Sequence, residues 1–204
     1  MARRLLDVAV SSVVVVLMPP LWLVASVMIK VDTKGPVLYR SSRVGKDGRP
    51  FTILKFRSMV ARADAEGPRV TTEGDPRITR VGRVLRDLKI DEIPQFLNVL
   101  KGDMSLVGPR PEDPRYVAHY TVEQRRVLSV RPGIVSPAAI AYRHEEAILA
   151  RLGGGPEDAY LETVLPHKLS MDLAYIDQRS LGLDLTILTR ALLSIFTNER
   201  STGT

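Results

Sequence analysis

The 204-residue sequence contains no cysteine, which excludes disulfide bonds and thiolate metal sites. Aromatic residues make up only 5% of the chain, and no nucleic-acid-binding motif is recognisable. These two absences argue against nucleic acid as the partner. No internal repeat is visible, so the chain is not a repeat array.

Basic residues outnumber acidic ones, and the formal net charge of +6 at pH 7 favours an anionic partner. Anionic lipid and phosphorylated metabolites both carry the required charge. Hydrophobic residues at 45% and charged residues at 25% are ordinary for a folded protein. A chain of this length can form one domain with a core, plus an appendage.

A run of 22 residues without a charge, residues 8–29, lies near the N-terminus. At a rise of about 1.5 Å per residue, one helix of this length would just span a hydrocarbon core of roughly 30 Å. Pro19 and Pro20 lie in the middle of the run and break a straight helix there, leaving halves that each match about one leaflet. No cleavage site of the A-x-A type follows the run, so a signal peptide is not indicated.

Basic residues flank the apolar run on both sides, which favours the cytoplasmic side of a membrane for both flanks. A re-entrant helix that enters and leaves through one membrane face satisfies the flanking charges and the break. A kinked spanning helix is the alternative, because membrane helices tolerate proline. The residues alone leave both open.

Asp47 and Gly48 separate two β-rich runs, residues 37–44 and 51–58, and predict a β-hairpin. Lys55, on the second run, either projects a cation toward a site or, as is more common, is a solvated charge at a strand edge. Residues 61–75 are polar and Gly-rich, which predicts a loop.

A helix is predicted after this loop, with Asp75 as its N-cap and Pro76 at its first position. Apolar residues at helical spacing form one side of it, and four arginines recur every third residue around the other. These arginines are ordinarily a solvated basic face or a contact with lipid headgroups. The alternative is that Arg86, the arginine nearest the acids that follow, meets a phosphate.

Asp91 and Glu92 precede a further helix, whose predicted buried face is Phe96, Leu97 and Leu100 and whose end is Gly102. The macrodipole at a helix N-terminus favours ionised carboxylates, and an ionised carboxylate is what a nucleophile or a Mg²⁺ ligand must be. Helix capping is the ordinary function of acids at such a position, and the residues alone do not separate these interpretations.

Residues 160–179 and 184–196 predict two more amphipathic helices. The second of them either packs on the core or lies in a membrane interface. His167 is expected on the surface, and Glu145 and Glu146 are expected at an exposed helix start. The chain is therefore predicted to be α+β, mostly helical with a short β-hairpin.

The string DEIPQFLNVLKGDMSLVGPRPE, residues 91–112, closely resembles the signature of bacterial sugar transferases. These are the small monotopic phosphoglycosyl transferases that begin surface-glycan assembly. The resemblance extends, in the expected order, to KFRSM (55–59), DPRITRVGR (75–83) and VRPGI (130–134). It implies a monotopic protein with a re-entrant helix and amphipathic interfacial helices.

The resemblance implies transfer of sugar 1-phosphate from a UDP-sugar to a polyprenyl (undecaprenyl) phosphate, giving polyprenyl-diphospho-sugar and UMP. Asp91 would be the nucleophile that carries the phosphosugar, and Asp91 and Glu92 would hold Mg²⁺. Arg110 and Arg143 would lie on the nucleotide diphosphate, and Arg86 near the lipid phosphate. The implied phosphate- and nucleotide-binding residues are Lys55, Arg86, Arg110, Pro111 and Arg143.

The resemblance also implies three parts: residues 1–34 as a re-entrant membrane helix with its flanks, 35–197 as a catalytic domain on the cytoplasmic face of the bacterial inner membrane, and 198–204 as a polar tail. Membrane lipids would surround the first part. Many family members carry Ser-Pro where this chain has Pro19 and Pro20. Residues 134–146 differ from the sequence that several family members have there and resemble a different branch of the family. The preferred sugar is therefore open, and so is the question of whether Glu145 or Glu146 contacts it.

Two other functions share these features. A membrane-tethered basic module would bind anionic partners without catalysis. A Mg²⁺-dependent phosphohydrolase would use the same carboxylates but pass the product to water.

Overall fold

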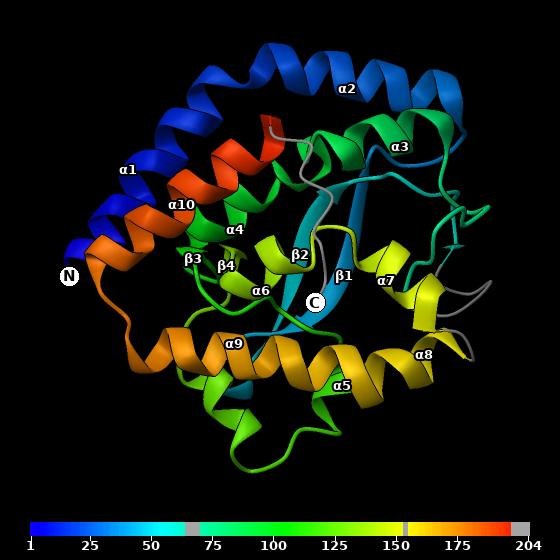
Figure 1. The fold of residues 1–204 in the computed structure, drawn as a ribbon. Coiled ribbons are helices and arrows are strands. Elements are labelled where there is room, and N and C mark those ends of the chain that lie inside the picture. The colour runs from blue at the N-terminus through cyan, green and yellow to red at the C-terminus, as the bar shows by residue number, and fades with distance from the viewer. Residues whose placement is uncertain (64–69, 153–154, 197–204) are drawn as a thin grey trace.

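The computed structural model of the chain describes residues 1–63, 70–152 and 155–196, with the side chains given through residue 194. Within these residues the chain is mostly helical and carries two two-stranded sheets (Figure 1). The helical composition and the hairpin are confirmed. The side chains of Ile195 and Phe196 and the predicted tail, 198–204, lie outside the described residues.

The helices, in chain order, are α1 (Ala2–Leu17), α2 (Pro19–Asp32), α3 (Arg80–Asp87), α4 (Gln95–Lys101), α5 (Pro114–Val117), α6 (Pro137–Ala141), α7 (Glu145–Leu152), α8 (Pro156–Ala159), α9 (Leu165–Asp177) and α10 (Leu181–Phe196). The strands are β1 (Leu38–Val44), β2 (Pro50–Phe56), β3 (Ser105–Val107) and β4 (Gly133–Val135).

The predicted break in the N-terminal apolar run is confirmed. Helices α1 and α2 meet at Met18 with a bend of 62°, because Pro19 can begin a helix but cannot continue one. In the part of the chain that the structure describes, no single helix is long and apolar enough to cross a membrane, whereas the bent pair meets that criterion together. Figure 1 shows the pair arched along one side of the molecule.

Many apolar side chains of this pair face outward. Those more than half exposed are Leu5, Val13, Val16, Leu17, Leu23, Val24, Val27 and Val31. The inward side of α2 packs through Ala25 and Ile29 on Phe56 and Leu85, and the Trp22 and Phe56 rings meet edge to face at 5.2 Å. An apolar surface of this extent is typical of contact with a membrane or a partner.

The N-terminal end of the helix pair is held by two charged residues, Arg4 and Asp7, which precede the apolar run 8–29 but lie within α1. Arg4 donates to the carbonyls of Val99, at 2.6 Å, and Leu100, at 2.9 Å, which lie at the C-terminal end of α4. Asp7 is buried and accepts from the Leu106 N–H of β3 at 2.9 Å. Arg4 thus binds the last turn of α4, where the Val99 carbonyl also accepts from the Gly102 N–H at 3.0 Å.

The C-terminal end of the helix pair is also held by an acid and an arginine. Asp32 accepts a hydrogen bond from the Val81 N–H, in the first turn of α3, at 3.1 Å. Arg57, which is buried, donates to the Thr33 and Lys34 carbonyls at 2.8 and 2.7 Å. The two ends of the bent pair are therefore bonded to α3 and α4, the helices on either side of the acid pair.

The predicted hairpin is confirmed: β1 and β2 pair antiparallel, with Leu38 opposite Phe56 and Val44 opposite Pro50. The second sheet was not predicted, because each of its strands has only three residues. There β3 pairs parallel with β4. The backbones of Gly108, just after β3, and Gly133, the first residue of β4, lie in close contact. A Cβ on Gly133 would lie 2.1 Å from the backbone nitrogen of Gly108.

The predicted start of α3 at Asp75 is wrong. The helix begins at Arg80, and its N-cap is Thr79, whose hydroxyl accepts from the Gly82 N–H at 2.9 Å. The residues before it form a turn, in which the Ile78 N–H donates to the Asp75 carbonyl at 3.1 Å, and Ile78 then forms an antiparallel bridge with Met59. Asp75 is buried and forms an ion pair with Arg77 at 2.6 Å instead of capping the helix.

The predicted buried face of α4 is also wrong. Gln95 and Asn98 are buried, whereas Phe96, Leu97 and Leu100 are only half-buried. Asn98 accepts from the Leu54 N–H at 3.0 Å and donates to the Thr52 carbonyl at 2.7 Å, so its amide completes the edge of β2. Gly102 ends the helix with φ of 91°, as predicted.

The C-terminal part of the chain forms α8, α9 and α10, and α10 packs in the same core cluster as residues of α1. A π-helical segment, Tyr160–Val164, joins α8 to α9, and His167 is exposed as predicted. Helix α10 packs through Ile187 on the core and leaves Leu185, Leu192 and Leu193 more than half exposed. The largest core cluster gathers Val44, Val70, Tyr116, Val117, Tyr120, Val127, Leu149, Tyr160, Val164, Leu165 and Leu169.

Candidate active site

Asp91 and Glu92 lie in a single 3₁₀ turn, Ile90–Glu92, between α3 and α4. Lys89, with φ of 57°, turns the chain sharply out of α3 just before them. Both acids are buried, at 6% and 8% exposed. Helix α4 has no side-chain cap, so capping is not the function of either carboxylate.

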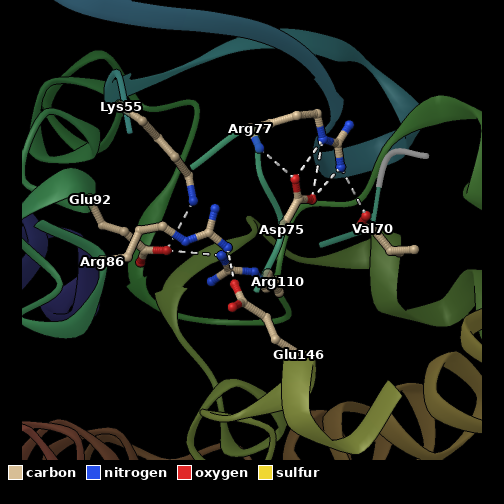
Figure 2. Close-up of polar contacts among 8 residues, drawn as sticks. All are labelled: Lys55, Val70, Asp75, Arg77, Arg86, Glu92, Arg110 and Glu146. Atoms are coloured by element: carbon tan, nitrogen blue, oxygen red, sulfur yellow. Dashed lines mark hydrogen bonds and ion pairs between the residues drawn. The ribbon is translucent and has the colours of Figure 1, made fainter. Parts of the chain in front are cut away.

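Glu92 is held by two cations. Its Oε1 accepts from Lys55 Nζ at 3.0 Å and from Arg110 Nη2 at 2.9 Å (Figure 2). Burial opposes ionisation, but the charges of Arg110 and Lys55 hold the pKa of Glu92 well below its usual range. Glu92 is therefore ionised, and the Lys55 side chain points into the site as the sequence predicted.

Asp91 has no such partner. Its Oδ1 is buried and makes no hydrogen bond among the residues that the structure describes. Burial raises the pKa of Asp91 above its usual value, although the charge of Lys55 acts against this. The predicted macrodipole stabilisation is not seen, because α4 starts four residues later and the carboxylate does not meet its N–H groups. A buried unpaired oxygen of this kind calls for a ligand.

The acid pair opens into a cavity of about 1720 Å³. Every catalytic, metal-binding and phosphate-binding residue predicted from the sequence lines it: Lys55, Arg86, Asp91, Glu92, Arg110, Pro111 and Arg143. These residues come from β2, α3, the turn before α4, the Gly-Pro-Arg-Pro segment and the end of α6. A space of this size accommodates a nucleotide-sized ligand and more.

Two of the predicted arginines are engaged with the protein. Arg86 pairs with Glu146 (Figure 2). Arg143 donates to the carbonyl of Ser194 and, at 3.3 Å, to that of Asp87. The structure thus places both on the cavity wall and neither in contact with Asp91. Glu145 and Glu146 lie at a helix start as expected, the first turn of α7, but they are half-buried in cavity-lining ion pairs, so the expected exposure is wrong.

The residues present fit a Mg²⁺ ion that is shared with a substrate. The described part of the chain holds no group of three or more His, Cys, Asp or Glu side chains suited to a metal. Magnesium sites commonly use one or two carboxylates and complete the shell with water and substrate phosphates. The unpaired Asp91 Oδ1 beside Glu92 supplies that smaller set.

Asp172 was missed by the sequence analysis. It lies on α9, is buried, and accepts from the Arg110 N–H at 3.4 Å, which supports the Gly-Pro-Arg-Pro segment from behind. Its Oδ1 has no partner among the described residues. Burial raises the pKa of Asp172 to about 6, although hydrogen bonds from Ser136, Arg110 and Ala138 act in the opposite direction.

Asp172→Asn is expected to change how stability depends on pH. An acid whose pKa is raised in the folded state is stabilising below its unfolded pKa, and that contribution is lost as pH rises through the folded value. The wild-type free energy of unfolding should therefore fall, relative to the variant, by roughly 3 kcal/mol between pH 4 and pH 7. Thermal unfolding in nanodiscs at several pH values would measure this.

The matched control for this prediction is Asp177→Asn, because Asp177 lies on the same helix but its side chain is 54% exposed. No comparable pH-dependent difference is expected for it. A constant stability difference between wild type and Asp172→Asn across that range would contradict the prediction.

The family model for bacterial sugar transferases matches residues 1–198. A relative from Caulobacter vibrioides, named UDP-glucose:undecaprenyl-phosphate glucose-1-phosphate transferase, is 39% identical over 202 residues, which cover 98% of this chain and 71% of the relative. A relative from Aeromonas hydrophila, named UDP-N-acetylgalactosamine-undecaprenyl-phosphate N-acetylgalactosaminephosphotransferase, is 38% identical over 200 residues, 96% of this chain and 44% of the relative.

A third relative, from Escherichia coli (strain K12), carries the same name as the first and is 34% identical over 206 residues. That alignment covers 97% of this chain and 40% of the relative. The chain thus spans less than half the length of the second and third relatives. The family model nevertheless covers almost all of it, and the chain belongs to the bacterial sugar transferase family.

Proposed function

We propose that this chain transfers sugar 1-phosphate from a UDP-sugar to a polyprenyl phosphate, the first membrane step in building a surface glycan. The products are polyprenyl-diphospho-sugar and UMP. The observation that carries the proposal is the buried, unpaired Asp91 carboxylate beside the Glu92, Lys55 and Arg110 cluster. The names of the relatives, which specify UDP-sugars and undecaprenyl phosphate, support the two substrates.

In the first step, one carboxylate oxygen of Asp91 attacks the β-phosphorus of the UDP-sugar. A new O–P bond forms, the bond to the bridging oxygen breaks, and UMP leaves with that oxygen. In the second step, an oxygen of the polyprenyl phosphate attacks the same phosphorus and breaks its bond to Asp91. The carboxylate is regenerated, and no net proton transfer is needed.

The surrounding charges suit this chemistry. Phosphoryl transfer between anions depends chiefly on neutralising their charge and on positioning. Lys55 and Arg110 bring two cations to the dyad of Asp91 and Glu92. Both cations pair with Glu92, which fixes the orientation of the two side chains. Asp91 and Glu92 are the residues that would hold Mg²⁺ together with substrate phosphates, and the bound ion would neutralise phosphate charge there.

We place the bent helix pair in the membrane as a re-entrant element, with membrane lipids around its apolar surface and the rest of the chain on the cytoplasmic face of the inner membrane. Hydrogen bonds at both ends support this, since Arg4 and Asp32 bind α4 and α3 of the same body. A spanning helix would separate its ends by the roughly 30 Å hydrocarbon core. The outward apolar side chains of α1 and α2 match lipid.

The test is UMP release by the full chain in nanodiscs, with a UDP-sugar, Mg²⁺ and with or without undecaprenyl phosphate. We expect UMP and polyprenyl-diphospho-sugar to form in equal amounts, and only when the lipid phosphate is present for turnover. UMP formation that continues without the lipid would identify a phosphohydrolase. Salt-sensitive binding without UMP from any UDP-sugar would identify a basic binding module and contradict the proposal.

A further inference from the structure

A second group of polar side chains lines the same cavity and takes no part in the phosphate chemistry above. It consists of Glu112, Glu145, Tyr160 and Lys168, which we call the lysine network. Glu112 lies only two residues beyond Arg110 in the chain. The other three come from α7, the π-helical segment and α9.

Lys168 is the centre of this network. Its Nζ donates to Glu145 Oε2 at 2.6 Å and to the Tyr160 hydroxyl at 3.2 Å, and lies 3.8 Å from Glu112 Oε1. The Tyr160 O–H donates to Glu112 Oε1 at 2.6 Å. Lys168 is 6% exposed and Tyr160 is 2% exposed. The network is therefore fixed in position before any ligand arrives.

The network is built differently from the phosphate-binding wall. Two carboxylates around one ammonium give it a net negative charge, which disfavours a diphosphate. Together it offers carboxylate acceptors, an ammonium donor and a phenol, which are suited to neutral groups rich in hydroxyls and amides. Glu145 Oε1 makes no hydrogen bond among the described residues and is an acceptor available at the cavity.

The position of the network matches the position of the sugar. In a UDP-sugar the sugar is joined to the β-phosphate by one oxygen, so it must lie next to the groups that hold this phosphate. Glu145 and Glu112 act with Glu92 to raise the pKa of Arg110, which shows that the network is within electrostatic reach of the dyad. Tyr160 begins a π-helical segment, a feature often found at functional sites.

We propose that Glu112, Glu145, Tyr160 and Lys168 bind the sugar of the nucleotide sugar and determine which neutral hexose or acetamido-hexose is accepted. This inference rests on the proposed function, because it assigns a part of the same cavity to a part of the same substrate. Glu145 accepts from a sugar hydroxyl or amide, and Lys168 with Tyr160 fixes the orientation of both carboxylates.

The test is Glu145→Gln, measured as UMP release with UDP-glucose, UDP-galactose, UDP-N-acetylglucosamine and UDP-N-acetylgalactosamine. Gln keeps an oxygen for Lys168 but lacks the charged acceptor. We expect kcat/KM for the preferred sugar to fall about tenfold or more, and the ratios between sugars to change. The KM for polyprenyl phosphate and inhibition by UMP, which has no sugar, should stay within about twofold of wild type.

Tyr160→Phe is a second variant that keeps the ring and removes the hydroxyl shared by Glu112 and Lys168, and it should also change the sugar ratios. The matched control is Glu157→Gln. Glu157 accepts from the Tyr116 hydroxyl at 3.0 Å, a similar bond, but it does not line the cavity. Its sugar ratios should equal those of the wild type.

Three outcomes would overturn the inference. An equal loss for all four sugars together with weaker UMP inhibition would show that the network only supports the fold. Unchanged sugar ratios in both Glu145→Gln and Tyr160→Phe would show that the sugar lies elsewhere. If the unmodified protein releases no UMP with any sugar, the proposed function fails and takes the subsite with it, whereas lipid-dependent UMP release with unchanged ratios removes the subsite alone.

Discussion

Asp91→Asn is expected to lower lipid-dependent UMP release by about ten-thousand-fold or more, as removal of a nucleophile does in other covalent mechanisms. Asn has nearly the shape of Asp, but it lacks the anionic oxygen that attacks phosphorus. Since Asp91 is buried and its Oδ1 makes no hydrogen bond among the described residues, the substitution breaks no contact that supports the fold. Thermal stability should therefore stay close to that of the wild type, or rise.

A covalent product can be sought directly. Incubation with a UDP-sugar but no lipid should add the mass of one sugar phosphate to the wild-type chain, on the peptide that contains Asp91. The variant should show no addition. Undiminished UMP release by Asp91→Asn would sink the nucleophile assignment. Asp103→Asn is the matched control, because Asp103 belongs to the same signature string but does not line the cavity.

Gly133→Ala is expected to destabilise the protein by about 3 kcal/mol or more, which is at the upper end for overpacking. Its Cβ would lie 2.1 Å from Gly108 N and 2.6 Å from Gly108 O, and backbone atoms cannot move aside as a flexible side chain can. Gly108 begins the Gly-Pro-Arg-Pro segment that carries Arg110. Strain there should also displace Arg110 from Glu92 and reduce UMP release.

The matched control is Gly182→Ala in α10, where an added Cβ would meet nothing within 4 Å. Alanine favours a helix over glycine, so this variant should be unchanged or more stable by up to about 1 kcal/mol. Thermal unfolding of both variants in the same nanodiscs measures the difference. Equal melting temperatures for Gly133→Ala and wild type would contradict the prediction.

The sequence located the features that depend on local chemistry. Pro19 placed the bend, Asp47 and Gly48 placed the hairpin, and Gly102 placed the end of α4, because each needs a particular backbone conformation. The start of α3 was wrong, since Asp75 is an equally good cap by residue type. The stretch instead forms a turn after Asp75, and the bridge between Met59 and Ile78, set by tertiary structure, follows it.

The residues of α4 illustrate a different limit. Hydrophobicity alone predicted a buried Phe96, Leu97 and Leu100, but the buried side of the helix is formed by Gln95, Asn98 and Val99, and the Asn98 amide completes the edge of β2. A single sequence carries no sign that a polar residue will have a buried partner 44 residues away.

In the candidate site, too, some residues could be predicted from the sequence and others depend on tertiary structure. The catalytic and phosphate-binding residues expected from the family resemblance all line the cavity, because a long matching string indicates a shared arrangement of the site. Lys168 and Tyr160 were not anticipated, because their partners lie far away in the sequence. Lys168 bonds to Glu145, 23 residues away, and Tyr160 bonds to Glu112, 48 residues away. The direction of the pKa shift of Asp91 was also not anticipated, because the burial that raises this pKa depends on the whole fold and not on the neighbouring helix.

The attachment of α1 and α2 has a practical consequence for handling the protein. Arg4 and Asp7 satisfy backbone groups of α4 and β3, and Asp32 satisfies the Val81 N–H of α3. A truncated chain that lacks residues 1–34 would leave these backbone groups of α3, α4 and β3 without their side-chain partners. It would also expose Phe56 and Leu85, which α2 covers. The helix pair is thus part of the framework that holds the turn carrying Asp91 and Glu92, as well as the proposed membrane anchor. If the pair lies in the membrane as proposed, detergents and lipids chosen during purification are expected to act on the geometry of the proposed nucleophile, and activity would be a sensitive measure of whether they preserve it.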